Sequence, residues 1–159
     1  MSQPVPPPGN PFADGAYPAA PQPAPVRDNV ALGVLAALVA ALVGGIVYGV
    51  VAGSIEREIG WAAIGVGFLA GFAASKVGGP NRILAVAAAV FSLGAVYLGQ
   101  LVGIAVIGSE ELNVPFAEMF FQHFDLLTQA WNESKDPMTF LFFVLAGVGA
   151  FGGARKAAQ

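Results

Sequence analysis

Few side chains in this sequence could do chemistry, and their types limit what that chemistry could be. The chain contains a single histidine, His123, and no cysteine. One imidazole without thiolates supplies too few ligands for a typical zinc site, and disulfide and thiol redox chemistry are excluded. No set of nucleophile, base and acid can be assembled from the other side chains. We therefore predict no catalytic residue, no metal site and no cofactor, and we expect the protein not to be an enzyme.

Two carboxylates and one amide are the strongest candidates for a functional role. Glu56 and Glu58 come just before the second of four apolar runs, where a helix N-terminus would stabilise negative charge. Dipole stabilisation alone would account for them. Alternatively, Glu58 pairs with Tyr48, or with Arg57 of a neighbouring chain, or binds a cation. Gln100 lies inside the third run, where amides usually bond to a neighbouring helix.

The sequence around these side chains is unusually apolar. Hydrophobic residues make up 56% of the 159 residues and charged residues 11%, whereas soluble chains carry about 25% charged residues. So small a soluble domain cannot hide that much apolar surface. The net charge is -3 and there is no basic run, which excludes nucleic acid as a partner. The composition predicts a lipid bilayer as the main partner.

Four uncharged runs are long enough to cross a bilayer as helices. They cover residues 29–55, 59–75, 83–109 and 137–154, and roughly 20 apolar residues span a bilayer core. The runs lack the alternation of barrel strands. The predicted fold class is an all-α integral membrane protein, a four-helix transmembrane bundle within a membrane domain of residues 30–156. The expected spans are about 30–53, 59–75, 83–107 and 138–154.

Polar residues mark where three of these helices begin. Asn29, following Asp28, and Asn81 are placed as N-caps of the first and third spans. Asp136 followed by Pro137 puts a capping carboxylate before a proline at the first helical position of the fourth span. We expect these residues to fix the starts of the helices.

The basic residues predict the orientation of the chain. Five lie near span ends on one side of the expected topology and two on the other: Arg27, Lys76, Arg82, Arg155 and Lys156 against Arg57 and Lys135. The richer side is expected to be cytoplasmic. The prediction is a multi-pass protein of the cell membrane with cytoplasmic N- and C-termini.

Residues 1–29 form a segment of different composition. Nine of the twelve prolines lie there, so we expect a disordered, polyproline-biased cytoplasmic tail. Pro4 and Pro7 have the spacing that ligands of aromatic-grooved domains use. A plain linker and a binding site for a protein partner both remain open.

The long outer loop between the third and fourth spans contains a helical pattern over residues 115–131. At 100° per residue the polar and apolar side chains fall on opposite faces; the apolar arc holds Phe116, Met119, Phe120, Phe124, Leu127 and Trp131. We predict an amphipathic outer helix that lies on the membrane surface or caps the bundle. It is a second possible surface for a protein partner.

Glycines recur every four residues in three of the spans. They are Gly45, Gly49 and Gly53 in the first, Gly67 and Gly71 in the second, and Gly99 and Gly103 in the third. Small residues at this spacing let helix backbones approach closely. We interpret them as helix-packing positions within one bundle, with a homo-oligomer interface or a pore as the alternative.

Residues 58–67, which read E-I-G-W-A-A-I-G-V-G, resemble the start of the second span in an uncharacterised group of bacterial membrane proteins. The resemblance covers roughly residues 30–156 and implies about four spans after a variable soluble segment. The zinc ribbon that precedes the spans in some members is impossible here, because the chain has no cysteine. The group brings no activity with it. We expect a non-enzymatic membrane component or partner-binding protein, with a small homo-oligomeric channel or permease as the alternative.

Overall fold

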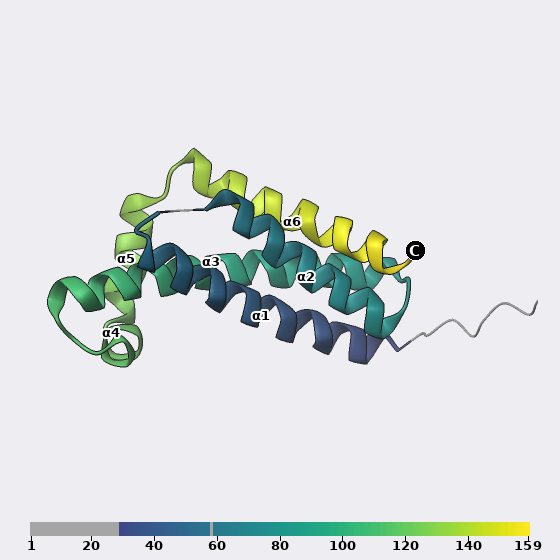
Figure 1. Cartoon of the computed structure of the whole chain (residues 1–159), viewed down its shortest axis with the longest axis horizontal. Helices are drawn as coiled ribbons and strands as arrows, with labels where there is room; N and C mark the ends of the chain where they lie inside the picture. Colours follow the sequence, from purple (N-terminus) through teal and green to yellow (C-terminus); the bar gives the residue numbers. More distant parts are fainter. Residues whose placement is uncertain (1–28, 58) are drawn as a thin grey trace, which may run out of the picture.

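The computed structural model describes residues 29–57 and 59–159, which form α-helices and no strand (Figure 1). Glu58 and residues 1–28, which hold nearly all of the predicted tail, lie outside the described residues. The helices in chain order are α1 (Val30–Ser54), α2 (Gly60–Gly78), α3 (Arg82–Leu112), α4 (Phe116–Gln122), α5 (Phe124–Ser134) and α6 (Pro137–Ala157).

Four of these helices, α1, α2, α3 and α6, are long and apolar enough to cross a membrane. The shortest, α2, has 19 residues, which at about 1.5 Å per residue gives about 28 Å, close to the ~30 Å hydrocarbon core of a bilayer. The predicted fold class, an all-α membrane protein built on a four-helix bundle, is confirmed. The start of α1 and the C-terminus lie at the same end of the bundle (Figure 1).

Polar side chains begin three of the spanning helices as predicted. Asn29 and Asn81 accept hydrogen bonds of 3.1 and 2.9 Å from backbone N–H groups in the first turns of α1 and α3. Asp136 accepts a bond of 2.9 Å from the backbone N–H of Thr139, and the Thr139 hydroxyl accepts one from the Asp136 N–H. The bond from the Thr139 N–H lowers the pKa of Asp136, because it stabilises the charged carboxylate.

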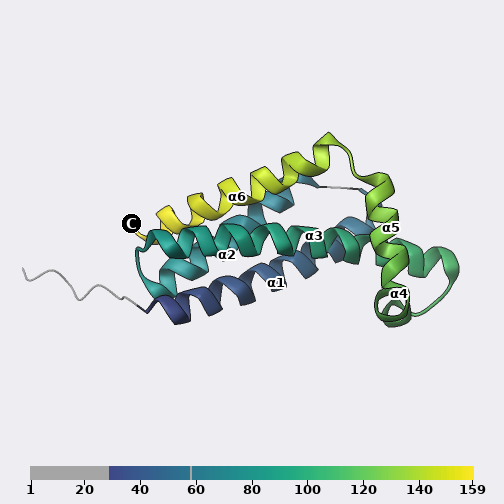
Figure 2. The same cartoon turned by 180° about the vertical axis from the view of Figure 1, so that it is seen from behind.

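The spanning helices form two parallel pairs. In one, α1 packs against α3, and in the other, α2 packs against α6. Further contacts between α1 and α2 and between α3 and α6 join the pairs into one bundle, as both views show (Figures 1 and 2). Successive spans are therefore antiparallel, whereas each parallel pair joins helices that are not neighbours along the chain.

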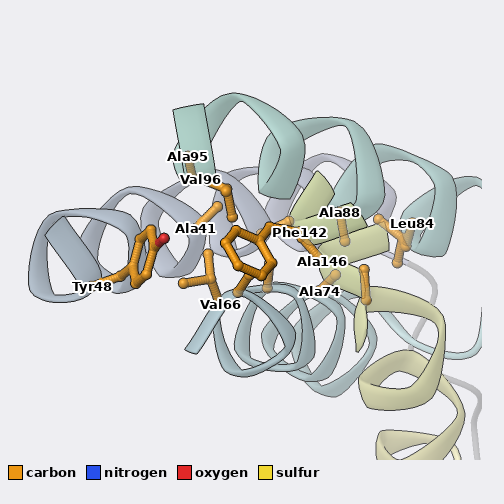
Figure 3. Packing of buried hydrophobic residues seen from close by; sticks show 14 residues of the cluster. Ala41, Tyr48, Val66, Ala74, Leu84, Ala88, Ala95, Val96, Phe142 and Ala146 are labelled. Atoms are coloured by element: carbon orange, nitrogen blue, oxygen red, sulfur yellow. The ribbon is translucent and has the colours of Figure 1, made fainter. Parts of the chain in front are cut away.

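The interior of the bundle consists mainly of small side chains. Those with no exposed surface include Ala37, Ala41, Ala63, Ala70, Ala74, Ala88, Ala146 and Ala150. Larger buried side chains such as Tyr48 and Phe142 lie among them (Figure 3). In lipid there is no hydrophobic drive between helices, so close van der Waals packing of small residues holds them together.

The segment between α3 and α6 forms two short helices where the sequence predicted a single helix over residues 115–131. A bend at His123, with φ -116° and ψ 33°, separates α4 from α5. The two helices lie across the end of the bundle at which α3 ends (Figure 2). We call α4 and α5 the cap, and this end of the bundle the cap end.

The cap covers a part of α3 that is too long for a bilayer. The 31 residues of α3 extend about 46 Å, against a core of about 30 Å. Leu101 and Ala105 of α3 are fully buried in a cluster with Met119 and Leu127 of the cap. The cap thus gives α3 apolar surroundings beyond the length that a bilayer covers. The helix continues through Leu112, beyond the span end predicted near residue 107.

Candidate functional site

Glycines bring α1 and α3 into backbone contact. A methyl group added at Gly45 would collide with the carbonyl oxygen of Ala95, and one at Gly49 would collide with that of Gly99. At Gly99 a methyl group would lie 2.6 Å from both the Gly45 carbonyl oxygen and the Tyr48 ring. The missing side chain at Gly99 therefore makes room for the Tyr48 ring.

The pair α2 and α6 is built in the same way. A methyl group at Gly67 or Gly71 would collide with a carbonyl oxygen of α6, and one at Gly149 or Gly153 would collide with a carbonyl oxygen of α2. The packing glycines named from the sequence thus lie at contacts between helices of one chain.

The contact between α1 and α3 stays close towards the cap end, since a methyl group at Gly53 would lie 2.7 Å from Val106 Cβ and 2.8 Å from the carbonyl oxygen of Gly103. A methyl group at Gly103 would lie 3.3 Å from the carbonyl oxygen of Gly49, a tight contact but not a collision. Gly53 and Gly103 line a cavity of about 140 Å³ between the two helices. We call this cavity the polar pocket; its lining residues are Tyr48, Ala52, Gly53, Glu56, Arg57, Gln100, Gly103, Ile104 and Ile107.

The polar side chains of the pocket are arranged by depth. Gln100 and Tyr48 are 7% and 4% exposed, so they form its buried part. Glu56 and Arg57 are exposed to solvent and form its rim. A polar molecule entering the pocket would pass two opposite charges before it reached the amide of Gln100.

Gln100 connects the pocket to the cap. Its Oε1 accepts a hydrogen bond of 2.7 Å from the indole Nε1–H of Trp131 in α5. The indole ring packs edge-on against the Tyr97 ring with centroids 4.9 Å apart, and Lys135 Nζ lies 5.4 Å from its centroid. A hydrogen bond between neutral groups contributes about 1 kcal/mol net, so the contacts of Trp131 with Gln100 and Tyr97 fasten α5 to α3.

The amide nitrogen of Gln100 is buried and has no hydrogen-bond partner among the described residues. Its identity is fixed by chemistry: an indole N–H can only donate, so the amide oxygen must face Trp131. Nε2 then carries two donor hydrogens, and leaving a buried donor unsatisfied costs about 1–3 kcal/mol. An acceptor bound beside Gln100 would relieve this cost.

The rim of the pocket is a strained turn. Glu56 has a φ of 52°, in the left-handed region that glycine normally takes after a helix. Its N–H donates to the Gly53 carbonyl and the N–H of Arg57 donates to the Ala52 carbonyl, both at 3.1 Å. A side chain in this conformation costs about 1 kcal/mol or more. The turn places both charged residues beside the polar pocket.

The rim lies at the depth expected for lipid headgroups. Large apolar side chains are exposed along α1 from Leu32 to Val51, and the surface becomes charged at Glu56 and Arg57. Trp61, at the start of α2, is 83% exposed, as is typical of tryptophans at a membrane interface. Gln100 lies 18 residues from the first residue of α3, or about 27 Å along a helix.

The structure brings two of the three candidate residues together. Glu56 and Gln100 line the same pocket, while Glu58 lies outside the described residues. Glu56 lies in the turn that ends α1 and not in the first turn of α2. The sequence suggested Arg57 only as a partner of Glu58 from a neighbouring chain, and it did not indicate Trp131 as the partner of Gln100. The available signal was that a buried amide oxygen and an indole N–H each need a partner.

The pocket has a largely apolar lining into which four polar side chains bring hydrogen bonding and charge. It combines an amide and a phenol with one carboxylate and one guanidinium. Within residues 29–57 and 59–159, no three histidine, aspartate or glutamate side chains come together as a metal site would require. Comparison of the chain with protein-family models, with curated proteins and with solved structures finds no match.

Proposed function

We propose that this protein is a non-enzymatic membrane component that binds a partner protein through its cap. The observation that supports the proposal is an exposed aromatic surface outside the bundle. Phe121 is 77% exposed, and Phe116 and Phe124 are 40% and 41% exposed. We call these three residues the aromatic face. Exposed apolar patches of this kind mark surfaces that bind proteins or membranes.

The aromatic face is ordered by its own packing. The half-buried Phe120 ring has centroid distances of 5.7 Å to Phe116, 5.4 Å to Phe121 and 5.8 Å to Phe124. Such aromatic pairs contribute about 0.5–1.5 kcal/mol each. A surface that is already ordered loses little side-chain entropy on binding. This favours a role in binding a partner over a role in only covering the end of the bundle.

The alternative is a small homo-oligomeric channel or permease. The observation that favours it is a second set of glycines, Gly65, Gly94, Gly147 and Gly152, at which an added methyl group would meet no atom within 4 Å. At these positions the backbones of α2, α3 and α6 are open to the outside of the bundle, where helices of another copy could approach. Because fully buried alanines fill the interior of one chain, a pore would have to run between copies.

Site-specific photocrosslinking in native membranes separates these proposals. We would place a photoreactive residue at Phe121 in the aromatic face, at Gly147 as an open position of α6, and at Glu133 as an exposed polar control on α5. A partner-binding cap gives one protein adduct from position 121 that is absent from 133 and is identified by mass spectrometry. Self-adducts from position 147 would favour the oligomer. Adducts of position 121 with lipid alone would contradict partner binding through the cap.

A further inference from the structure

We propose that the polar pocket binds the zwitterionic headgroup of an aminophospholipid. In this arrangement the phosphate oxygens face Gln100 and Arg57, and the ammonium group faces Glu56. The proposal concerns the pocket between α1 and α3 and is independent of any partner on the cap.

The acceptor half of the ligand is dictated by Gln100. The side chain is 7% exposed, its nitrogen has no partner in the described part of the chain, and the bond from Trp131 at 2.7 Å holds its oxygen. Only a hydrogen-bond acceptor satisfies the two remaining N–H groups. The guanidinium of Arg57 on the rim favours an acceptor with negative charge, and guanidinium groups match phosphate oxygens well.

The cationic half is dictated by the end of α1. Glu56 supplies a carboxylate beside the last carbonyl groups of the helix, and a helix C-terminus carries partial negative charge. Both features favour a cation at this part of the rim. A primary ammonium can donate hydrogen bonds to the carboxylate, whereas a quaternary ammonium cannot. A purely anionic headgroup would face Glu56 with charge of the same sign.

Size and depth also fit a headgroup. A single water needs about 10–15 Å³ of cavity, and the polar pocket, at about 140 Å³, has room for a larger polar group. Its charged rim follows directly on the lipid-facing apolar surface of α1 and precedes α2, whose first turn carries the exposed Trp61. A lipid would therefore reach the pocket without leaving the headgroup layer.

The test is lipid retention by the full chain, measured by native mass spectrometry from nanodiscs. The discs contain phosphatidylethanolamine mixed with an equal amount of either phosphatidylcholine or phosphatidylglycerol. We expect about a tenfold preference for phosphatidylethanolamine over each competitor, the factor that about 1.4 kcal/mol provides. Equal retention of the three lipids would overturn the proposal.

Three variants locate the effect. Gln100→Glu keeps an oxygen for Trp131 but replaces the donor nitrogen, and should abolish the preference. Glu133→Gln removes a carboxylate at an exposed position of α5 that does not line the pocket, so the preference should survive. Glu56→Gln, a change at an exposed position that leaves folding intact, should remove the discrimination against phosphatidylcholine. A preference unchanged in Glu56→Gln, or lost as fully in Glu133→Gln as in Gln100→Glu, would refute the assignment.

A competition arm identifies the source of the headgroup. Soluble phosphoethanolamine is added to the nanodiscs, and retention of phosphatidylethanolamine is measured again. Displacement of phosphatidylethanolamine by phosphoethanolamine at millimolar concentration shows that the pocket recognises the headgroup alone. Displacement by inorganic phosphate alone would overturn the role of Glu56.

Discussion

The two parallel helix pairs share the same small-residue packing but differ in what lies beside their contacts. Between α2 and α6, glycines on both helices lie against carbonyl oxygens of the other helix, and the contact is apolar. Between α1 and α3 the contact is equally close at Gly45, Gly49 and Gly53, but the polar pocket lies beside it at the cap end. We call α1 and α3, which carry the polar pocket, the open pair, and α2 and α6 the closed pair.

The difference shows how a site can be made inside a bundle of small residues. A polar side chain in a membrane needs both volume and partners. Glycine leaves volume beside the contact, because Gly53 and Gly103 line the pocket and have no side chain to fill it. The cap supplies a partner for Gln100 through Trp131. Among the described residues, the closed pair buries only short polar side chains, Ser75 of α2 and Thr139 of α6.

Filling the closed pair should have the largest effect. In Gly71→Val the new side chain would meet the carbonyl oxygen and backbone of Ala150, which cannot move without displacing α6. We expect a loss of about 3 kcal/mol or more, seen as a large fall in Tm in mild detergent. Gly147→Val is the control, because no atom lies within 4 Å of the added group. Equal Tm values for the two variants would show that the α2–α6 contact is not close.

Removing the tether of the cap should have the next largest effect, confined to the open pair. Trp131→Phe leaves the Gln100 oxygen without its donor, which costs about 1–3 kcal/mol. Hydrogen exchange should quicken in the cap and in residues 101–112 of α3, while α2 and α6 keep their protection. Uniform quickening across all four spans would mean that the bundle depends on the cap as a whole.

The strained turn of the open pair gives a stabilising prediction. α2 is followed by Gly79 at a φ of 91°, whereas the turn after α1 holds Glu56 at 52°. Glu56→Gly should therefore raise the stability by about 1 kcal/mol while removing the carboxylate from the pocket. Asn113→Gly, at a φ of 54°, is a matched control away from the pocket. A lower Tm for Glu56→Gly than for the parent would show that the carboxylate contributes more than the strain costs.

The smallest effect concerns the start of α6 and its dependence on pH. The hydrogen bond from Thr139 lowers the pKa of Asp136 from its ordinary value of 3.8. The stabilisation that the Asp136 carboxylate gives the folded state is therefore complete above the ordinary pKa. It is lost as the pH falls through the lowered pKa of the folded state. Asn caps helices as well as Asp does, so Asp136→Asn should keep the cap at every pH. Between pH 5 and 3 the Tm of the parent should fall slightly more than that of the variant.

The lengths of the apolar runs and the polar residues before them were enough to predict four spans. This works because a bilayer imposes one length on every span and because only a few residue types cap the start of a helix. Asn29, Asn81 and Asp136 begin their helices as expected. The spacing of the glycines, in contrast, could not say which helix each would meet, since any small residue fits any helix backbone.

The site could be predicted only in part. Gln100 was identifiable as a buried amide, but its partner Trp131 is 31 residues away in a segment whose bend at His123 has no glycine or proline to announce it. Glu56 was placed at the start of α2 because nothing in its residue type indicates a left-handed turn. Strained conformations are set by the surrounding fold, and the local sequence does not encode them.

The parallel pairing also sets the order in which the protein can assemble during synthesis. Gly49 and Gly99 are 50 residues apart, and Gly71 and Ala150 are 79 apart. At about 5–20 residues per second, a ribosome needs several seconds to deliver either partner. During that time α1 and α2 are already long enough to insert, yet the glycine faces that will hold them are uncovered. The nascent chain must keep these faces away from the helices of other proteins until the matching span arrives.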